Sequence, residues 1–164
     1  MKAKVAYGGV LTALALIFSY VESLIPLTIG IPGVKLGLAN LLIVFALYKL
    51  DTKMTLTISV VRILLSGFMF GNAFSIVYSL AGGLVSFLAM ICFKKTNAFT
   101  AAGVSISGGV FHNIGQMIVA IIVVESYYVV YYLPVLIVAG AITGLLIGIV
   151  TEAVLFRIKS LNFE

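Results

Sequence analysis

Arg62 is the side chain in this sequence that points most directly to chemistry. It lies nine residues beyond Lys53 in an apolar run, so in a helix it stands roughly 13 Å further along the axis. If that helix crosses a bilayer, Arg62 lies near the middle of the apolar layer, where a cation must meet a partner, water or a ligand. We expect it to bind a ligand, to pair with Glu22 or to contact a helix C-terminus. Ligand binding is compatible with either structural role.

A second polar cluster consists of His112, Asn113 and Gln116, again within an apolar segment. Gly108, His112 and Gln116 are four residues apart and share one face of a helix, with Asn113 to one side. This cluster favours a ligand-binding site. The alternative is hydrogen bonding between helices, worth about 0.6 kcal/mol per contact. One histidine and one cysteine, Cys92, provide no transition-metal cage.

Lys35 directly follows a proline–glycine pair and would open the next helix. A lysine there is unfavourable for the helix dipole, which is easier to understand if it meets an anion; the alternative is exposure at the membrane surface. Asn40 and Asn72 could add donors to the same outer cavity, and Glu22 and Glu125 could be rim carboxylates or partners of the cations. The expected ligand-binding residues are Lys35, Asn40, Arg62, Asn72, His112, Asn113 and Gln116.

Signatures of catalysis are missing from the sequence. It has no phosphate-binding glycine loop and no nucleophile elbow, and Asp51 is its only aspartate. Magnesium–diphosphate chemistry needs clustered carboxylates. The net charge of +5 comes without a basic face, which argues against nucleic acid as a partner. We therefore expect no enzyme, no cofactor and no bound metal.

The elements that position these residues are predicted to be transmembrane helices. Of 164 residues, 63% are hydrophobic and 9% charged, against roughly 45–50% and 25% in globular proteins. Lipid is the solvent that fits, and it requires closed backbone hydrogen bonding. We predict an all-α integral membrane protein, a single domain over residues 1–164, with six helices spanning 3–24, 34–49, 53–70, 73–93, 99–124 and 133–158.

Basic residues predict the orientation of this bundle. Eight of the ten lie before the first helix, in the 2–3 and 4–5 turns, or at the end of the sixth helix. With six spans these segments share one side, which the positive-inside rule places in the cytoplasm together with both termini. We thus expect a multi-pass protein of the cell membrane. The opposite side carries an aromatic belt formed by Tyr127, Tyr128, Tyr131 and Tyr132.

Small residues form stripes on several of the predicted helices. The sixth helix carries Gly140, Gly144 and Gly148 four residues apart, a pattern that usually brings two helices into close contact. Gly9 and Ala13 form a similar pair near the cytoplasmic end of the first helix. That pair could instead dock the helix of a partner.

Four segments resemble the Gx transporter family, which also carries the label heptaprenyl diphosphate synthase component I. They are 32–40, 62–71, 79–83 and 108–116, which contain Lys35, Arg62, Gly82 and His112. The family is similar to the substrate-binding S components of energy-coupling-factor (ECF) transporters. The resemblance covers nearly the whole chain and is weakly specific for any ligand.

The resemblance implies a six-helix protein with both termini inside that captures a vitamin-like molecule from outside. Such a protein docks on a membrane coupling subunit through small residues of its first helix, here Gly9 and Ala13, and two cytoplasmic ATPases drive release. The ligand would be vitamin-like, a quinone precursor or of isoprenoid type. The alternative is a non-catalytic accessory subunit of a heptaprenyl diphosphate synthase. An autonomous small transporter is a third reading, which no inverted repeat supports.

Overall fold

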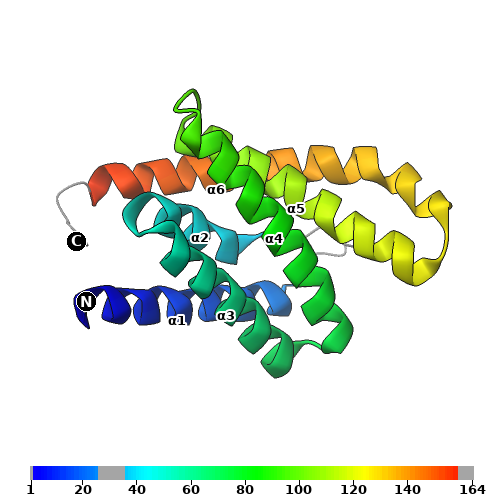
Figure 1. Cartoon of the computed structure of the whole chain (residues 1–164), viewed down its shortest axis with the longest axis horizontal. Helices are drawn as coiled ribbons and strands as arrows, with labels where there is room; N and C mark the ends of the chain where they lie inside the picture. The colour runs from blue at the N-terminus through cyan, green and yellow to red at the C-terminus, as the bar shows by residue number, and fades with distance from the viewer. Residues whose placement is uncertain (1, 26–35, 159–164) are drawn as a thin grey trace.

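A computed structural model describes residues 2–25 and 36–158 of the chain (Figure 1). In these ranges the backbone forms six α-helices, one short 3-10 helix and no strand. Five of the α-helices are long and apolar enough to cross a membrane, as expected of a multi-pass membrane protein. The helices are α1 (Lys2–Leu24), α2 (Leu38–Lys49), α3 (Thr52–Phe70), α4 (Ala73–Lys95), α5 (Ala101–Val124), η1 (Tyr127–Tyr132) and α6 (Leu133–Arg157).

Helix α2 forms the centre of the bundle. It contacts α1, α3, α5 and α6, and every residue from Leu42 to Leu47 is buried. A helix that is apolar all round is expected at such a position, since no face of it needs solvent. Its 12 residues extend about 18 Å, less than the roughly 30 Å of a bilayer core.

The start of α2 differs from the prediction. A helix beginning at Val34 was expected, but Leu36 and Gly37 are not helical and α2 begins at Leu38. Gly37 has φ 71° and ψ 29°, a left-handed conformation that glycine adopts without steric cost. Val34 and Lys35 lie outside the described residues.

Helices α5 and α6 meet backbone to backbone along the predicted glycine stripe, which confirms its packing role. A Cβ added at Gly144 would lie 2.7 Å from the Ser105 carbonyl oxygen, and one at Gly148 would lie 2.5 Å from Ala102 Cα. Helix α4 approaches α5 in the same way, since a Cβ at Gly115 would lie 2.7 Å from the carbonyl oxygen of Ala81. Helices α4, α5 and α6 are therefore closely joined.

Helix α1 is the peripheral element. It packs on α2 and α3 and leaves much of its surface exposed (Figure 1). Gly8 is buried, and a Cβ there would lie 3.1 Å from the sulfur of Met54. Gly9 and Ala13 are exposed, and a Cβ at Gly9 would meet nothing within 4 Å.

The helix ends that carry basic residues gather at one end of the bundle. Lys49 Nζ donates to the carbonyl oxygen of Ile158 at 3.0 Å, and Lys94 Nζ donates to that of Leu47. The first turn of α1 and the last turn of α6 lie at this same end (Figure 1). These lysines satisfy helix carbonyls that have no partner within their own helix.

Candidate functional site

Arg62 lies on a polar face of α3. Thr55, Ser59, Arg62 and Ser66 follow one another at helical spacing, and Thr55 and Ser59 are buried. The Arg62 side chain is half-buried, while its Nε atom is fully buried and has no hydrogen-bond partner among the described residues. A strong donor of the guanidinium is thus left unused inside the protein.

Glu22 connects two helices. It lies half-buried in the last turn of α1. Its Oε1 accepts a hydrogen bond from the backbone N–H of Gly37 at 2.6 Å. One carboxylate therefore links the end of α1 to the start of α2, and the expected pairing of Glu22 with Arg62 stays a prediction.

His112 and Gln116 share a face of α5 and lie against a glycine of α4. A Cβ added at Gly82 would lie 2.9 Å from His112 Cε1 and 2.8 Å from Gln116 Cγ. Gln116 is 2% exposed, and its Nε2 has no hydrogen-bond partner among the described residues. The structure therefore brings these two predicted site residues together and leaves a second buried donor unused.

Asn113 lies on a different side of α5 and contacts α6. Its Nδ2 donates to the carbonyl oxygen of Leu136 at 2.6 Å, and the residue is buried. A Cβ added at Gly140 would lie 2.8 Å from the same nitrogen. The hydrogen bond joins α5 to α6, so Asn113 serves the scaffold, and any further role in binding stays a prediction.

The two adjacent glycines Gly82 and Gly83 place the α3 and α5 clusters at one height in the bundle. A Cβ at Gly83 would lie 2.7 Å from Cδ1 of Ile63, the residue after Arg62. Gly82 meets His112 and Gln116 on the other neighbouring helix. Arg62 and Gln116 therefore lie at a similar height along the helix bundle, that is, at the same level.

Of the remaining predicted residues, the structure describes Asn72 and Asn40. Asn72 is exposed and caps α4: its Oδ1 accepts from the Ser75 N–H at 2.8 Å, and Ser75 Oγ accepts from the Asn72 N–H at 3.0 Å. Asn40 is half-buried in the first turn of α2. Lys35 lies outside the described residues. Ligand binding by these three residues stays a prediction.

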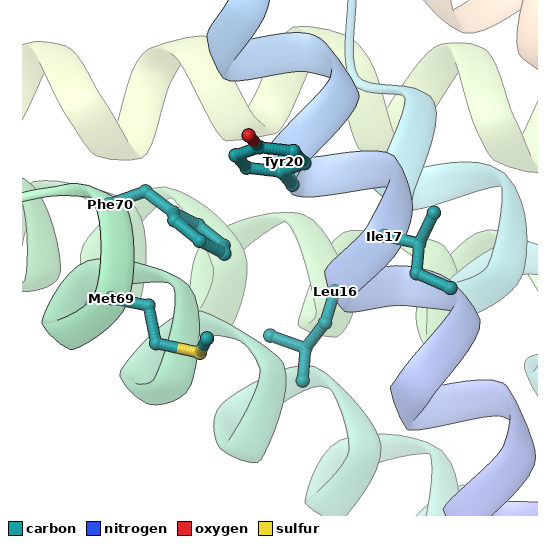
Figure 2. Close-up of a pocket in the computed structure, with 5 residues that line it drawn as sticks. All are labelled: Leu16, Ile17, Tyr20, Met69 and Phe70. Carbon is teal, nitrogen blue, oxygen red and sulfur yellow. The ribbon is translucent and has the colours of Figure 1, made fainter.

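An apolar groove opens between α1 and the end of α3 (Figure 2). Its volume is about 260 Å³, and its lining carries no polar surface. Figure 2 shows Tyr20 and Leu16 on the side of α1 toward Phe70 and Met69 of α3, and the rings of Tyr20 and Phe70 lie 5.0 Å apart. Met69 lies on the same face of α3 as Arg62, about 10 Å further along. The lining residues are Leu16, Ile17, Tyr20, Met69 and Phe70.

Glu152 is a charged residue that the sequence reasoning missed. Its Oε1 accepts from the backbone N–H of Ala102 at 2.9 Å. Thr100, the N-cap of α5, makes no side-chain capping bond of its own. The sequence signal for this contact was a single glutamate four residues beyond Gly148 on the same helix. Gly148 packs closely against Ala102, so the start of α5 lies within reach of the Glu152 side chain.

Metal chemistry has no evident site in the described part of the chain, where no three His, Cys, Asp or Glu side chains are grouped to hold an ion. The unused donors of α3 and α5 are instead suited to oxygen acceptors.

A family model described as heptaprenyl diphosphate synthase component I matches residues 11–154. No match was found among curated proteins or among solved structures. The matched range runs from the first half of α1 to the last turn of α6 and includes Arg62, His112 and Gln116. Because it spans most of the chain, the protein belongs to the heptaprenyl diphosphate synthase component I family.

Proposed function

We propose that this protein is the membrane-embedded substrate-binding subunit of an uptake transporter of the energy-coupling-factor type. It captures a small vitamin-like, quinone-precursor or isoprenoid-type molecule through the level of the bundle that holds Arg62, His112 and Gln116. The observation that carries the proposal is the set of buried donors without partners. These are Arg62 Nε and Gln116 Nε2, joined by the hydroxyls of Ser86 and Ser105.

Buried hydrogen-bond donors that have no acceptor destabilise a folded protein. An unsatisfied buried polar group costs about 1–3 kcal/mol, and native proteins contain few of them. All four atoms can donate a hydrogen bond, and they lie on the neighbouring helices α3, α4 and α5. A ligand rich in oxygen acceptors would satisfy them, which makes binding the simplest explanation of their persistence.

The exposed small-residue face of α1 supports the second half of the proposal. Gly9 and Ala13 present no bulky side chain, and Gly8 instead faces α3. Small residues let a second helix approach closely in lipid. We assign this face to docking on a membrane coupling subunit, and ATP hydrolysis to cytoplasmic ATPases. The protein then lies in the cell membrane, with the end of the bundle that is rich in basic residues in the cytoplasm.

A second candidate is favoured by the family match itself. As a non-catalytic component of a heptaprenyl diphosphate synthase, the chain would hold a soluble prenyltransferase at the membrane. Prenyl transfer would then belong to that partner. The apolar groove between α1 and α3 would suit an isoprenoid chain in either role.

Native mass spectrometry of the protein, extracted from its membrane under mild conditions, tests the two proposed functions in one experiment. Recovery with a coupling subunit, ATPases and a bound small molecule supports transport, and recovery with a prenyltransferase supports the rival. Arg62→Ala should lose the bound molecule. The matched control is Arg157→Ala, which removes an exposed arginine at the end of α6. Retention of the molecule by Arg62→Ala and His112→Ala would show that the proposed site is wrong.

A further inference from the structure

Ser86 on α4 and Ser105 on α5 are two buried polar residues outside the level of Arg62 and Gln116. Ser86 is 2% exposed and Ser105 is 0% exposed. Neither Oγ atom has a hydrogen-bond partner among the described residues. A serine hydroxyl has one donor and two acceptor lone pairs, so both residues leave hydrogen-bonding capacity unused inside the bundle.

Other buried hydroxyls of the bundle show how a helix can satisfy such a group. Thr151 on α6 donates to the carbonyl oxygen four residues earlier at 2.8 Å, and Ser107 on α5 donates to the one three residues earlier at 2.7 Å. Ser86 and Ser105 make no such bond to their own helices. Because a buried hydroxyl without a partner is unfavourable, we expect these two to bind a group between the helices.

Both hydroxyls border Gly108 in the contact between α4 and α5. A Cβ added at Gly108 would lie 3.4 Å from Ser86 Oγ and 2.7 Å from the sulfur of Met90. Ser105 lies three residues before Gly108, one turn away on the same face of α5. Gln116 lies eleven residues beyond Ser105, about 16 Å along the helix axis. Ser105 is therefore displaced from Gln116 toward the start of α5.

The closeness of α4 and α5 restricts what can bind between them. Further along the same contact, a Cβ at Gly115 would lie 2.7 Å from the carbonyl oxygen of Ala81, and one at Gly82 would lie 2.9 Å from that of His112. Helix backbones this close leave no room for an organic molecule, whereas water is small enough. Buried waters in proteins bond to polar groups that are otherwise unsatisfied, and water can both donate and accept.

We propose that Ser86 and Ser105 hold ordered water inside the α4–α5 contact, beside Gly108 and Met90. The water site itself is independent of the proposed function, but its role rests on that function. A ligand held by Arg62 and Gln116 reaches the two hydroxyls through this water. Recognition of the ligand then has a direct part and a water-mediated part.

Radiolytic hydroxyl-radical footprinting of the purified protein tests the water site. A radical formed from a buried water reacts with the side chain beside it, and methionine is readily oxidised to its sulfoxide. Met90 is 1% exposed and Met117 is 4% exposed, so both are shielded from radicals of the bulk solvent. We expect Met90 to be oxidised more than Met117, with Met69, which is 64% exposed, as the reference for dose.

Substitution of the hydroxyls identifies the source of this oxidation. In Ser86→Ala/Ser105→Ala, Met90 oxidation should fall to the level of Met117. Ser107→Ala is the matched control and should leave Met90 oxidation unchanged, because the Ser107 hydroxyl already donates to its own helix. The proposal is overturned if Met90 of the wild type reacts no more than Met117, or if the double variant retains Met90 oxidation.

Two further comparisons keep the result specific. If the double variant does not fold, Ser86→Ala and Ser105→Ala are irradiated separately, and unchanged Met90 oxidation in both overturns the proposal. The assay involves neither a ligand nor a transport partner, so its failure leaves the proposed function standing. Retention of the bound molecule by Arg62→Ala, by contrast, would overturn the proposed ligand site and leave the water site intact.

Discussion

Gln116 provides a test, at the residue scale, of whether the proposed binding opposes the stability of this protein. Its Nε2 is buried without a partner, while the rest of the side chain packs against Gly82. Methionine has a similar shape and no donor. We expect Gln116→Met to stabilise the ligand-free protein by about 1 kcal/mol, because an unsatisfied group is removed, and to weaken ligand binding. Reversible unfolding in mixed detergent measures the stability.

Asn113 provides the matched comparison for this prediction. Its Nδ2 donates to the Leu136 carbonyl oxygen, so Asn113→Leu removes a hydrogen bond that is made. We expect Asn113→Leu to destabilise the protein, by about 1 kcal/mol. A loss of stability in Gln116→Met as large as in Asn113→Leu would mean that Gln116 already has a partner in the scaffold.

Sequence reasoning at this scale identified the polar residues but not their partners. The spacing of His112 and Gln116 correctly placed them on one face, because helical periodicity is a local property. It could not show that Asn113 would be used by α6 or that Asn72 would cap α4, since both depend on which helix lies opposite. Glu152 was missed for the same reason.

At the scale of elements, Glu152 holds the start of α5 from the neighbouring helix. It accepts from the N–H of Ala102, one of the N-terminal groups that a helix leaves without partners. We expect Glu152→Ala to destabilise the bundle by about 1 kcal/mol, the usual cost of losing an N-cap. Hydrogen exchange should locate the change in the first turn of α5. Unchanged protection there would contradict the capping role.

Substitutions at two glycines on different helices can distinguish an effect on folding from an effect on partner binding. Gly144 lies in the α5–α6 contact and Gly9 lies on the exposed face of α1. Gly144→Val should destabilise the protein by about 2 kcal/mol or more, because its side chain would meet the backbone of α5. A Cβ at Gly9 would meet nothing within 4 Å, so Gly9→Val should leave the unfolding midpoint nearly unchanged while reducing co-purification of the proposed coupling subunit. Normal partner recovery with Gly9→Val would exclude this face from docking.

Helix limits were largely predictable, and their exceptions have local causes. The prediction for α3 was correct to within one residue, because Asp51 caps it through the Met54 N–H at 3.2 Å. The start of α2 was misplaced because apolarity alone does not show that Gly37 adopts a left-handed conformation. The 3-10 helix at Tyr127–Tyr132 was expected only as a tyrosine-rich connection.

For the whole molecule, the arrangement of helix ends makes the orientation testable. The turn after α4 and the segment before η1 lie at opposite ends of α5. In a Cys92→Ser background, Thr96→Cys should be protected from a membrane-impermeant maleimide in intact cells, and Ser126→Cys should react. The reverse labelling would place the basic end outside, and equal labelling of both would contradict the six-helix arrangement.

The close fit of α5 against α6 has a consequence for how this protein can change over generations. Positions such as Gly144 and Gly148 admit no larger residue without moving a backbone, so they and the α5 residues opposite them, Ser105 and Ala102, restrict each other. The outer face of α1, by contrast, contacts nothing else in the described chain at Gly9. Variation can accumulate on that face without loss of the fold, so these two surfaces of the protein can diverge at different rates between lineages.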